Sequence, residues 1–200
     1  MSDLRWLNKR AWDYLSEFQQ SQDQLIIQQS ILNANTWVAL SDPTYKLNFD
    51  AAIFKELNCS GVGAIIRNRK GEVMAAMFAK GPPVEDSEEA ESLACRRAVE
   101  FAINAGFSEL VIEGDNVAVM TSFSHGGPNM SRLGHVVHDI QWLATGLRWA
   151  SFSHVRRSAN SVAHVLARHA RNVVEDMIWL EETPPPAVVA LYSNFLHLSE

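Results

Sequence analysis

Three short runs decide the fold class of this chain: KLNFDAAI (residues 46–53), GVGAIIRN (61–68) and EVMAAMFAK (72–80). The first run alternates apolar and polar residues, as a half-buried strand does. The other two are also strand-like, and Arg69-Lys70-Gly71 between them is a turn signal that is typical of a hairpin. We therefore expect three consecutive antiparallel strands.

After the hairpin, helices and strands alternate. Asp86-x-x-Glu89 is a capping box that opens a helix, and Gly106 stands where the C-terminal cap of that helix belongs. The patterns that follow predict a strand at 109–115, helices at 116–123 and 132–144, a fifth strand at 149–155 and a helix at 161–173. Three strands followed by alternation predict an α/β fold with a five-stranded mixed sheet and helices packed on its faces.

The remaining residues flank this unit. The N-terminal stretch is roughly amphipathic until Asp42-Pro43 breaks the pattern, so we expect a helical extension or linker over residues 1–44. The main domain is then expected to span residues 45–175. Residues 176–200 form a tail that contains a run of three prolines and a short helix.

Composition excludes several classes of protein. The 47% hydrophobic and 20% charged content is ordinary for a globular protein, and no apolar run is long enough for a membrane helix. Only Cys59 and Cys95 are present, which fits a reducing intracellular compartment. The net charge of −6 argues against a general polyanion binder, yet residues 147–174 hold five arginines and no acidic residue. This stretch is equally consistent with a phosphate-binding face and with a solvated basic face.

Three acidic residues have positions that suggest chemistry. Asp50 lies on the first strand, Glu91 in the first turns of the helix after the hairpin, and Asp115 at the end of a buried strand. Carboxylates brought together repel one another unless cations neutralise them, and such a cluster suits Mg²⁺. Two ions held there could activate a water for phosphodiester hydrolysis. Each residue alone also has an ordinary explanation: the wet face of a strand, an exposed helix position and an N-cap.

The motifs taken together are more specific than any one of them. They cover roughly residues 37–191 and comprise YKLNFD (45–50), GVGAIIRN (61–68), AESLA (90–94), EGDN (113–116), FSHVRR (152–157), AHVLA (163–167) and IWLEE (178–182). In this order they resemble a type 1 ribonuclease H. The sequence is most similar to the reverse-transcriptase-like ribonuclease H domains of plant non-LTR retroelements and their dispersed genomic relatives.

This resemblance implies cleavage of the RNA strand of RNA–DNA hybrids by two metal ions, Mg²⁺ or Mn²⁺. It also implies that Asp50, Glu91 and Asp115 are catalytic residues that bind the metal. The fourth acidic position of the family falls on His164, which is usual in the plant subfamily and which we count as the fourth catalytic residue. Histidine supplies no negative charge and prefers softer metals than Mg²⁺.

The same resemblance suggests which residues meet the nucleic acid: Arg156, Arg157, Asn160 and Asn116. Ala51 replaces the usual glycine after the first aspartate, which would tighten the backbone there. The sequence also lacks the histidine-bearing loop of bacterial enzymes and a basic, tryptophan-rich handle between the middle helices. Weak affinity for the hybrid should follow, since phosphate contacts dominate binding.

Three hypotheses for function follow. The first is a ribonuclease H type endonuclease that is intracellular, has no membrane partner and is nuclear rather than cytoplasmic on family grounds. The second is a domesticated retroelement domain that is weak or inactive as an enzyme and binds nucleic acid. The third is a protein-interaction module, in which residues 1–40 supply a surface for a protein partner or for self-association.

Overall fold

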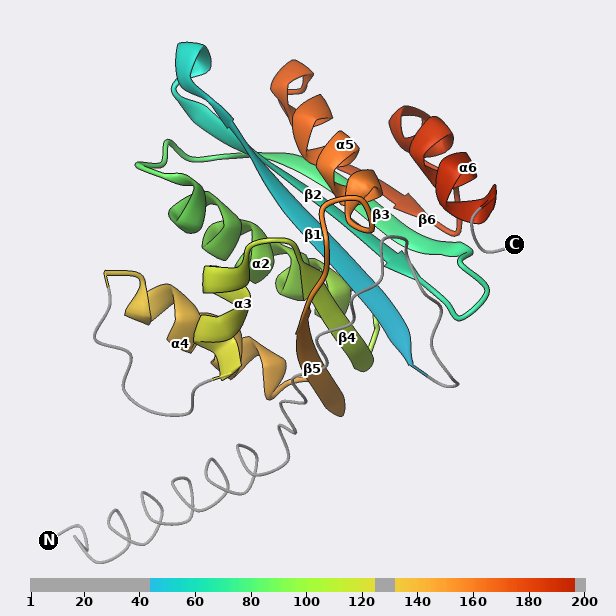
Figure 1. Cartoon of the computed structure of the whole chain (residues 1–200), viewed down its shortest axis with the longest axis horizontal. Coiled ribbons are helices and arrows are strands. Elements are labelled where there is room, and N and C mark those ends of the chain that lie inside the picture. Colours follow the sequence, from blue (N-terminus) through green and yellow to red (C-terminus); the bar gives the residue numbers. More distant parts are fainter. Residues whose placement is uncertain (1–43, 125–131, 197–200) are drawn as a thin grey trace, which may run out of the picture.

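A computed structural model describes residues 44–124 and 132–196 of the protein (Figure 1). Within these ranges one mixed sheet has the strand order β5-β4-β1-β2-β3-β6. Its strands are β1 (Tyr45–Phe54), β2 (Cys59–Arg67), β3 (Val73–Gly81), β4 (Glu109–Gly114), β5 (Trp149–His154) and β6 (Met177–Leu180). Strands β1, β2 and β3 are antiparallel neighbours, whereas β4 runs parallel to β1 and β5 parallel to β4. The α/β class and the mixed sheet are therefore confirmed.

The sheet has six strands, so the expected number of five was wrong. The additional strand is β6, which pairs antiparallel with β3 through Ala75↔Leu180 to Phe78↔Met177. It comes from the segment that the sequence suggested was only a tail. Three of its four residues are exposed and all four are apolar, so no alternation of polar and apolar residues marked it as a strand.

Helices cover both faces of the sheet (Figure 1). On one face lie α2 (Ser87–Asn104), α3 (Val117–Ser124) and α4 (Gly134–Ala144), and on the other lie α5 (Ser161–His169) and α6 (Val188–Leu196). Short 3-10 turns complete the fold: η1 (Lys55–Leu57), η2 (Ala170–Asn172) and η3 (Pro185–Ala187). The helix expected over 161–173 is thus α-helical only to His169 and continues as a 3-10 turn.

Local signals in the sequence explain both ends of α2. The carboxylate of Asp86 accepts a hydrogen bond of 2.9 Å from the backbone N–H of Glu89, as the capping box predicted. At the other end Gly106 has φ 86°, a left-handed conformation that costs glycine little. Because α2 begins at a defined residue, Glu91 is set one turn into the helix.

The residues of β1 divide between two cores. Leu47 and Phe49 pack toward α2, whereas Lys46, Asn48 and Asp50 are buried on the opposite side of the strand, the side that α5 covers. The polar side of β1 is therefore not a solvated face.

The helical extension expected over residues 1–44, and with it the partner surface at 1–40, lies outside the described residues except for Thr44. None of the helices in the described ranges has the length and apolar character needed to span a bilayer.

Candidate active site

The site forms where β4 ends beside β1. The last pair between these strands is Asn48↔Glu113, and Asp50 lies two residues further along β1, beyond the end of β4. Asp115 follows β4 directly. Because no strand borders β1 on this side at Asp50, side chains from helices on both faces of the sheet can reach this carboxylate.

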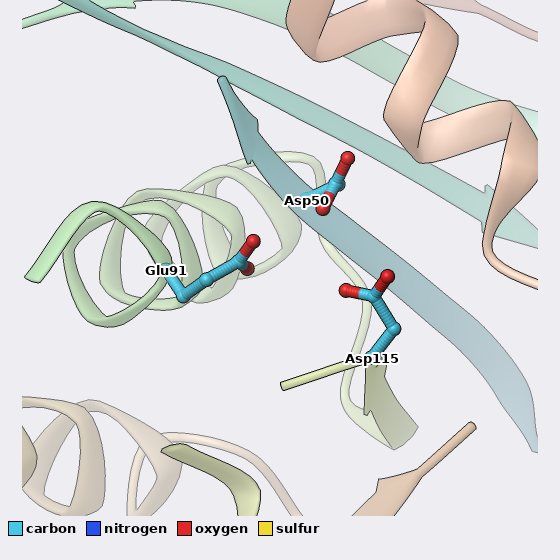
Figure 2. Close-up of side chains that lie close together, drawn as sticks. All are labelled: Asp50, Glu91 and Asp115. Carbon is cyan, nitrogen blue, oxygen red and sulfur yellow. The ribbon is translucent and has the colours of Figure 1, made fainter. Parts of the chain in front are cut away.

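Three carboxylates converge at this position. Asp50, Glu91 and Asp115 each offer an oxygen, and these oxygens all lie within 4.8 Å of one another. Figure 2 shows the three side chains directed toward a common space from β1, α2 and the end of β4. Asp50 is only 2% exposed and Glu91 only 7%. The structure therefore brings together the three acidic residues that the sequence singled out.

The environment of these carboxylates favours their neutral forms when no cation is bound. Burial and then the negative charge of Asp115 raise the pKa of Asp50, although its contact with His164 acts in the opposite direction. Burial, followed by the charge of Asp50, raises the pKa of Glu91 from 4.5 to about 10. Proximity of like charges away from water is the physical cause in both cases.

The donor set fits a hard divalent cation. Oxygen Oε1 of Glu91 accepts a 3.3 Å hydrogen bond from the backbone N–H of Ala51, but the buried Oε2 has no hydrogen-bond partner among the described residues. Mg²⁺ and Mn²⁺ both take carboxylate oxygens as ligands. Ala51 itself pairs regularly with Val62 and does not have a positive φ, so its backbone conformation is one that alanine adopts readily.

His164 reaches the site from α5. Its Nδ1 lies 2.6 Å from Oδ2 of Asp50, and its side chain is partly exposed. The approach of α5 depends on Gly63, which pairs with Asp50 across β1 and β2. A Cβ atom at Gly63 would lie 2.3 Å from the backbone nitrogen of Ala167 and 2.4 Å from the carbonyl oxygen of Ala163. Glycine at this position therefore lets the backbone of α5 rest directly on β2.

The contact with Asp50 limits the chemical roles that the His164 imidazole can have in the site. In this arrangement His164 is a hydrogen-bond partner of a carboxylate, whereas the cluster of close ligand atoms consists of the three acidic residues. A protonated or neutral imidazole can hold the Asp50 carboxylate in one orientation. It cannot use Nδ1 for that contact and for a metal at the same time.

Of the four residues expected to meet nucleic acid, Arg157 contacts both His164 and Asp115. One of its guanidinium nitrogens is 3.2 Å from Nδ1 and 3.3 Å from Nε2 of His164, and another is 3.9 Å from Asp115. Its side chain is 68% exposed and so remains accessible to a ligand. Arg156 is exposed as well.

The two asparagines have structural contacts. The side-chain oxygen of Asn116 accepts a 3.2 Å hydrogen bond from the N–H of Val119 and caps α3. Asn160 is buried, and its side-chain nitrogen donates a 2.8 Å hydrogen bond to the carbonyl oxygen of Phe49. Asn160 thus holds the start of α5 against β1 beneath the surface, and its contact with nucleic acid stays a prediction.

Sequence reasoning missed a buried ionic network below the site. Glu113 accepts hydrogen bonds of 2.7 Å from Lys46 and 2.8 Å from the side chain of Asn48. The guanidinium of Arg67 donates to Asn48 at 2.8 Å and to Asn194 of α6 at 3.2 Å. Burial lowers the pKa of Arg67 to about 9. The only signal in the sequence was the repeat of polar residues at every second position of β1.

Comparison with known proteins identifies the family. Residues 48–170 match the family described as "Reverse transcriptase-like", a stretch that covers more than half of the chain. The chain belongs to this family. The resemblance expected from the motifs is therefore confirmed at the level of the reverse-transcriptase-like ribonuclease H domain, while a plant source and descent from a retroelement stay predictions. No curated protein matches the sequence at a significant level.

Solved structures similar to this reverse-transcriptase-like protein include ribonucleases H. RNase H1 from the halophilic archaeon Halobacterium salinarum NRC-1 is 24% identical to this chain, with a TM-score of 0.59. The match covers 65% of this chain and 98% of that chain. The N-terminal RNase H domain of a Mycobacterium tuberculosis protein, solved as a fusion with maltose binding protein, is 20% identical with a TM-score of 0.55 over 64% and 92% of the two chains.

A third similar structure contains a ligand. LC11-RNase H1, isolated from compost by a metagenomic approach, was solved in complex with an RNA/DNA hybrid. It is 18% identical to this chain, with a TM-score of 0.55, and 63% of this chain and 95% of that chain are covered. At such identities the three likenesses establish the ribonuclease-H-like fold.

Proposed function

We propose that this protein is a metal-dependent endonuclease that hydrolyses the RNA strand of RNA–DNA hybrids. The observation that carries the proposal is the convergence of Asp50, Glu91 and Asp115, with a buried oxygen of Glu91 that has no partner in the described part of the chain. Membership of the reverse-transcriptase-like family supports it, as does the fold shared with ribonucleases H, one of which was solved with a hybrid.

The chemistry follows from the donor set. Mg²⁺ or Mn²⁺ held by the three carboxylates would polarise the scissile phosphodiester and lower the pKa of the attacking water. The carboxylates must be ionised to hold such ions, so the raised pKa values of Asp50 and Glu91 would fall when the cations bind. His164 orients Asp50 in this arrangement. Arg157 places a positive charge at the mouth of the site, where a phosphate backbone would approach.

Selection of the hybrid would depend on the shape of the duplex and on 2′-hydroxyl groups, with little reading of bases. The exposed side chains of Arg156 and Arg157 lie on the strand-to-helix connection between β5 and α5, and Arg157 has a nitrogen 3.9 Å from Asp115. Together with Asn116 they are the residues that we propose contact the nucleic acid directly.

The decisive experiment is cleavage of a labelled RNA–DNA hybrid in Mg²⁺ and separately in Mn²⁺, with DNA duplex and RNA duplex as comparison substrates. Asp50→Asn and Asp115→Asn should each abolish cutting of the hybrid. Asp139→Asn is the matched control, because Asp139 is an exposed carboxylate on α4 that pairs with Arg96 at 3.5 Å. Hybrid binding by folded wild-type protein without cutting in either metal would instead support a domesticated binding domain.

We also propose that the protein acts inside the cell and in the nucleus. Family resemblance is the basis of this assignment, and the proposed substrate, an RNA–DNA hybrid, is compatible with it. Fluorescence microscopy of the full chain, tagged at either end, tests the compartment. Signal that is confined to the cytoplasm with both tags would contradict the nuclear assignment and leave the proposed reaction unaffected.

A further inference from the structure

A groove of about 520 Å³ lies next to the carboxylates, between the end of β1 with η1 and α5. Residues 51–54 at the end of β1 form part of its wall. Six charged or titratable side chains line the rest: Lys55, Glu56, Arg157, His164, Arg168 and Arg171. The groove therefore joins two segments that are far apart in the sequence, and its lining is strongly basic.

The groove is continuous with the proposed active site. His164 belongs to its lining and contacts Asp50 at 2.6 Å. Arg157 also belongs to its lining and has a nitrogen 3.9 Å from Asp115. A polymer bound across the carboxylates could thus continue into the groove without leaving the surface.

The charges in the groove differ from those of the chain as a whole. The chain carries a net charge of −6, but the groove has four basic side chains and one acidic side chain. Arg168 has no hydrogen-bond or ion-pair partner among the residues that the structure describes. Arg171 pairs with Glu56 at 3.0 Å, but the two side chains are 50% and 78% exposed, so this ion pair is weak. Two guanidinium groups are therefore available to an anionic ligand.

The spacing of these groups suits a nucleic-acid backbone. His164, Arg168 and Arg171 follow one side of α5 and η2 over seven residues, which is about 10 Å at 1.5 Å per residue. One strand of a duplex presents a phosphate about every 3.4 Å along the helix axis. The row of side chains can therefore meet two or three consecutive phosphates.

We propose that this groove is a phosphate-binding subsite that holds the backbone of the strand being cut, on one side of the scissile bond. The inference rests on the proposed function and adds to it a second line of contact, supplied by Arg168 and Arg171. Because the contacts are to phosphates, they contribute affinity and position, and they are insensitive to base sequence.

The test is the salt dependence of binding. Anisotropy of a fluorescein-labelled RNA–DNA hybrid is measured with the full chain in EDTA over a range of salt concentrations. Arg168→Gln and Arg171→Gln should each weaken binding and reduce the slope of log K against log salt by about 1. Arg148→Gln is the matched control, because Arg148 lies before β5 at the other end of the sheet and pairs with Glu109 at 3.0 Å.

A second variant has the opposite expected effect. Glu56→Gln removes the acidic side chain of the groove and releases Arg171, so binding should become tighter and the slope steeper. Glu56 is exposed on the short turn η1, and its substitution removes no buried contact. A gain in affinity cannot result from partial unfolding.

The possible results distinguish a failure of the proposed phosphate-binding subsite from a failure of the proposed nuclease activity. Arg148→Gln should keep the wild-type slope. If Arg168→Gln and Arg171→Gln keep it as well, the groove does not hold the backbone. This conclusion holds whether or not the same wild-type preparation cuts the hybrid. Failure of the wild type to bind hybrid, DNA duplex or RNA duplex at low salt would also overturn the proposal. Reduced slopes in the two variants, with no cutting by the wild type, would support the subsite and contradict the enzymatic function.

Discussion

At the level of single residues, the protonation of Glu91 links the stability of the protein to the state of its site. The folded protein holds a proton on Glu91 up to a pKa of about 10, whereas the unfolded chain releases it near the ordinary value of 4.5. Between these values the folded state binds more protons than the unfolded state. The free energy of unfolding of the metal-free protein should therefore fall as pH rises.

This first prediction is tested by denaturant unfolding in EDTA at pH 5.5, 7.0 and 8.5. The contribution of Glu91 to the free energy of unfolding is complete below the pKa that Glu91 has in the unfolded chain. It is lost as pH rises toward the pKa that Glu91 has in the folded protein, at a rate of at most about 1.4 kcal/mol per pH unit for one proton. The raised pKa of Asp50 acts in the same direction. In Glu91→Gln the dependence should be flatter, and equal slopes in the two proteins would contradict the prediction.

A second prediction concerns divalent ions. Mg²⁺ or Mn²⁺ at millimolar concentration should raise Tm, and should do so more at pH 8.5 than at pH 6, because the ions compete with protons for the carboxylates. Each tenfold excess of metal over its Kd adds about 1.4 kcal/mol, and each kcal/mol shifts Tm by about 2–4 °C for a chain of this size. Thermal unfolding of Asp50→Asn should show no such shift, while Asp139→Asn should respond as the wild type does.

At the level of elements, the position of α5 on β2 determines where His164 lies. The helix backbone occupies the space that a side chain at Gly63 would need, and a Cβ at Gly61 would likewise lie 2.5 Å from the carbonyl oxygen of Ala167. The two glycines of GVGAIIRN thus do more than fit a strand, because they permit close packing of strand and helix. The contact between His164 and Asp50 depends on that packing.

The third prediction is that Gly63→Ala lowers stability by about 1–3 kcal/mol through overpacking. The helix must move away from β2 to admit the methyl group, and this lengthens the contact between His164 and Asp50. Urea unfolding gives the first quantity, and a crystal structure of the variant gives the second. Gly146→Ala is the comparison: a Cβ at Gly146 would lie 3.2 Å from the carbonyl oxygen of Leu143, a milder contact than those at Gly63, so its substitution should cost less stability than Gly63→Ala. Unchanged stability in Gly63→Ala would contradict the packing argument.

At the level of the whole molecule, the buried network joins the C-terminal helix to the strands that carry the site. Arg67 of β2 contacts Asn48 of β1 and Asn194 of α6. Asn48 in turn contacts Glu113 of β4. Buried polar groups that satisfy one another specify one arrangement of the elements, because any other would leave a charge without partners. The C-terminal segment is therefore part of the fold that supports the site.

The fourth prediction follows from this link. Asn194→Ala removes one hydrogen-bond acceptor from the buried guanidinium of Arg67 and should lower the free energy of unfolding by about 1–3 kcal/mol. Ser193→Ala is the control, because Ser193 is an exposed neighbour on α6 and its hydroxyl donates a hydrogen bond to the carbonyl oxygen of Val189, one turn earlier in the same helix. Guanidinium unfolding monitored by tryptophan fluorescence measures both. Equal stability of the two variants would show that α6 is not held by the network.

Several features of the protein depend only on neighbouring residues and can be predicted from the sequence. Short patterns predict the hairpin, the capping box at Asp86 and the order of helices and strands from β1 to α5. They also single out the three acidic residues at strand and helix ends. Backbone propensity, side-chain periodicity and helix capping act within a few residues. A single sequence is therefore enough to predict the features that depend on them.

Other features depend on segments that are distant in the sequence, and they are seen only in the folded protein. It showed that Asp50, Glu91 and Asp115 meet, that the polar side of β1 lies buried under α5, and that β6 extends the sheet. It also revealed the network around Arg67 and the basic groove between η1 and α5. These contacts join residues from 19 to 127 positions apart. Which distant elements pack together depends on the burial and pairing of groups across the whole chain, and no local pattern contains that information.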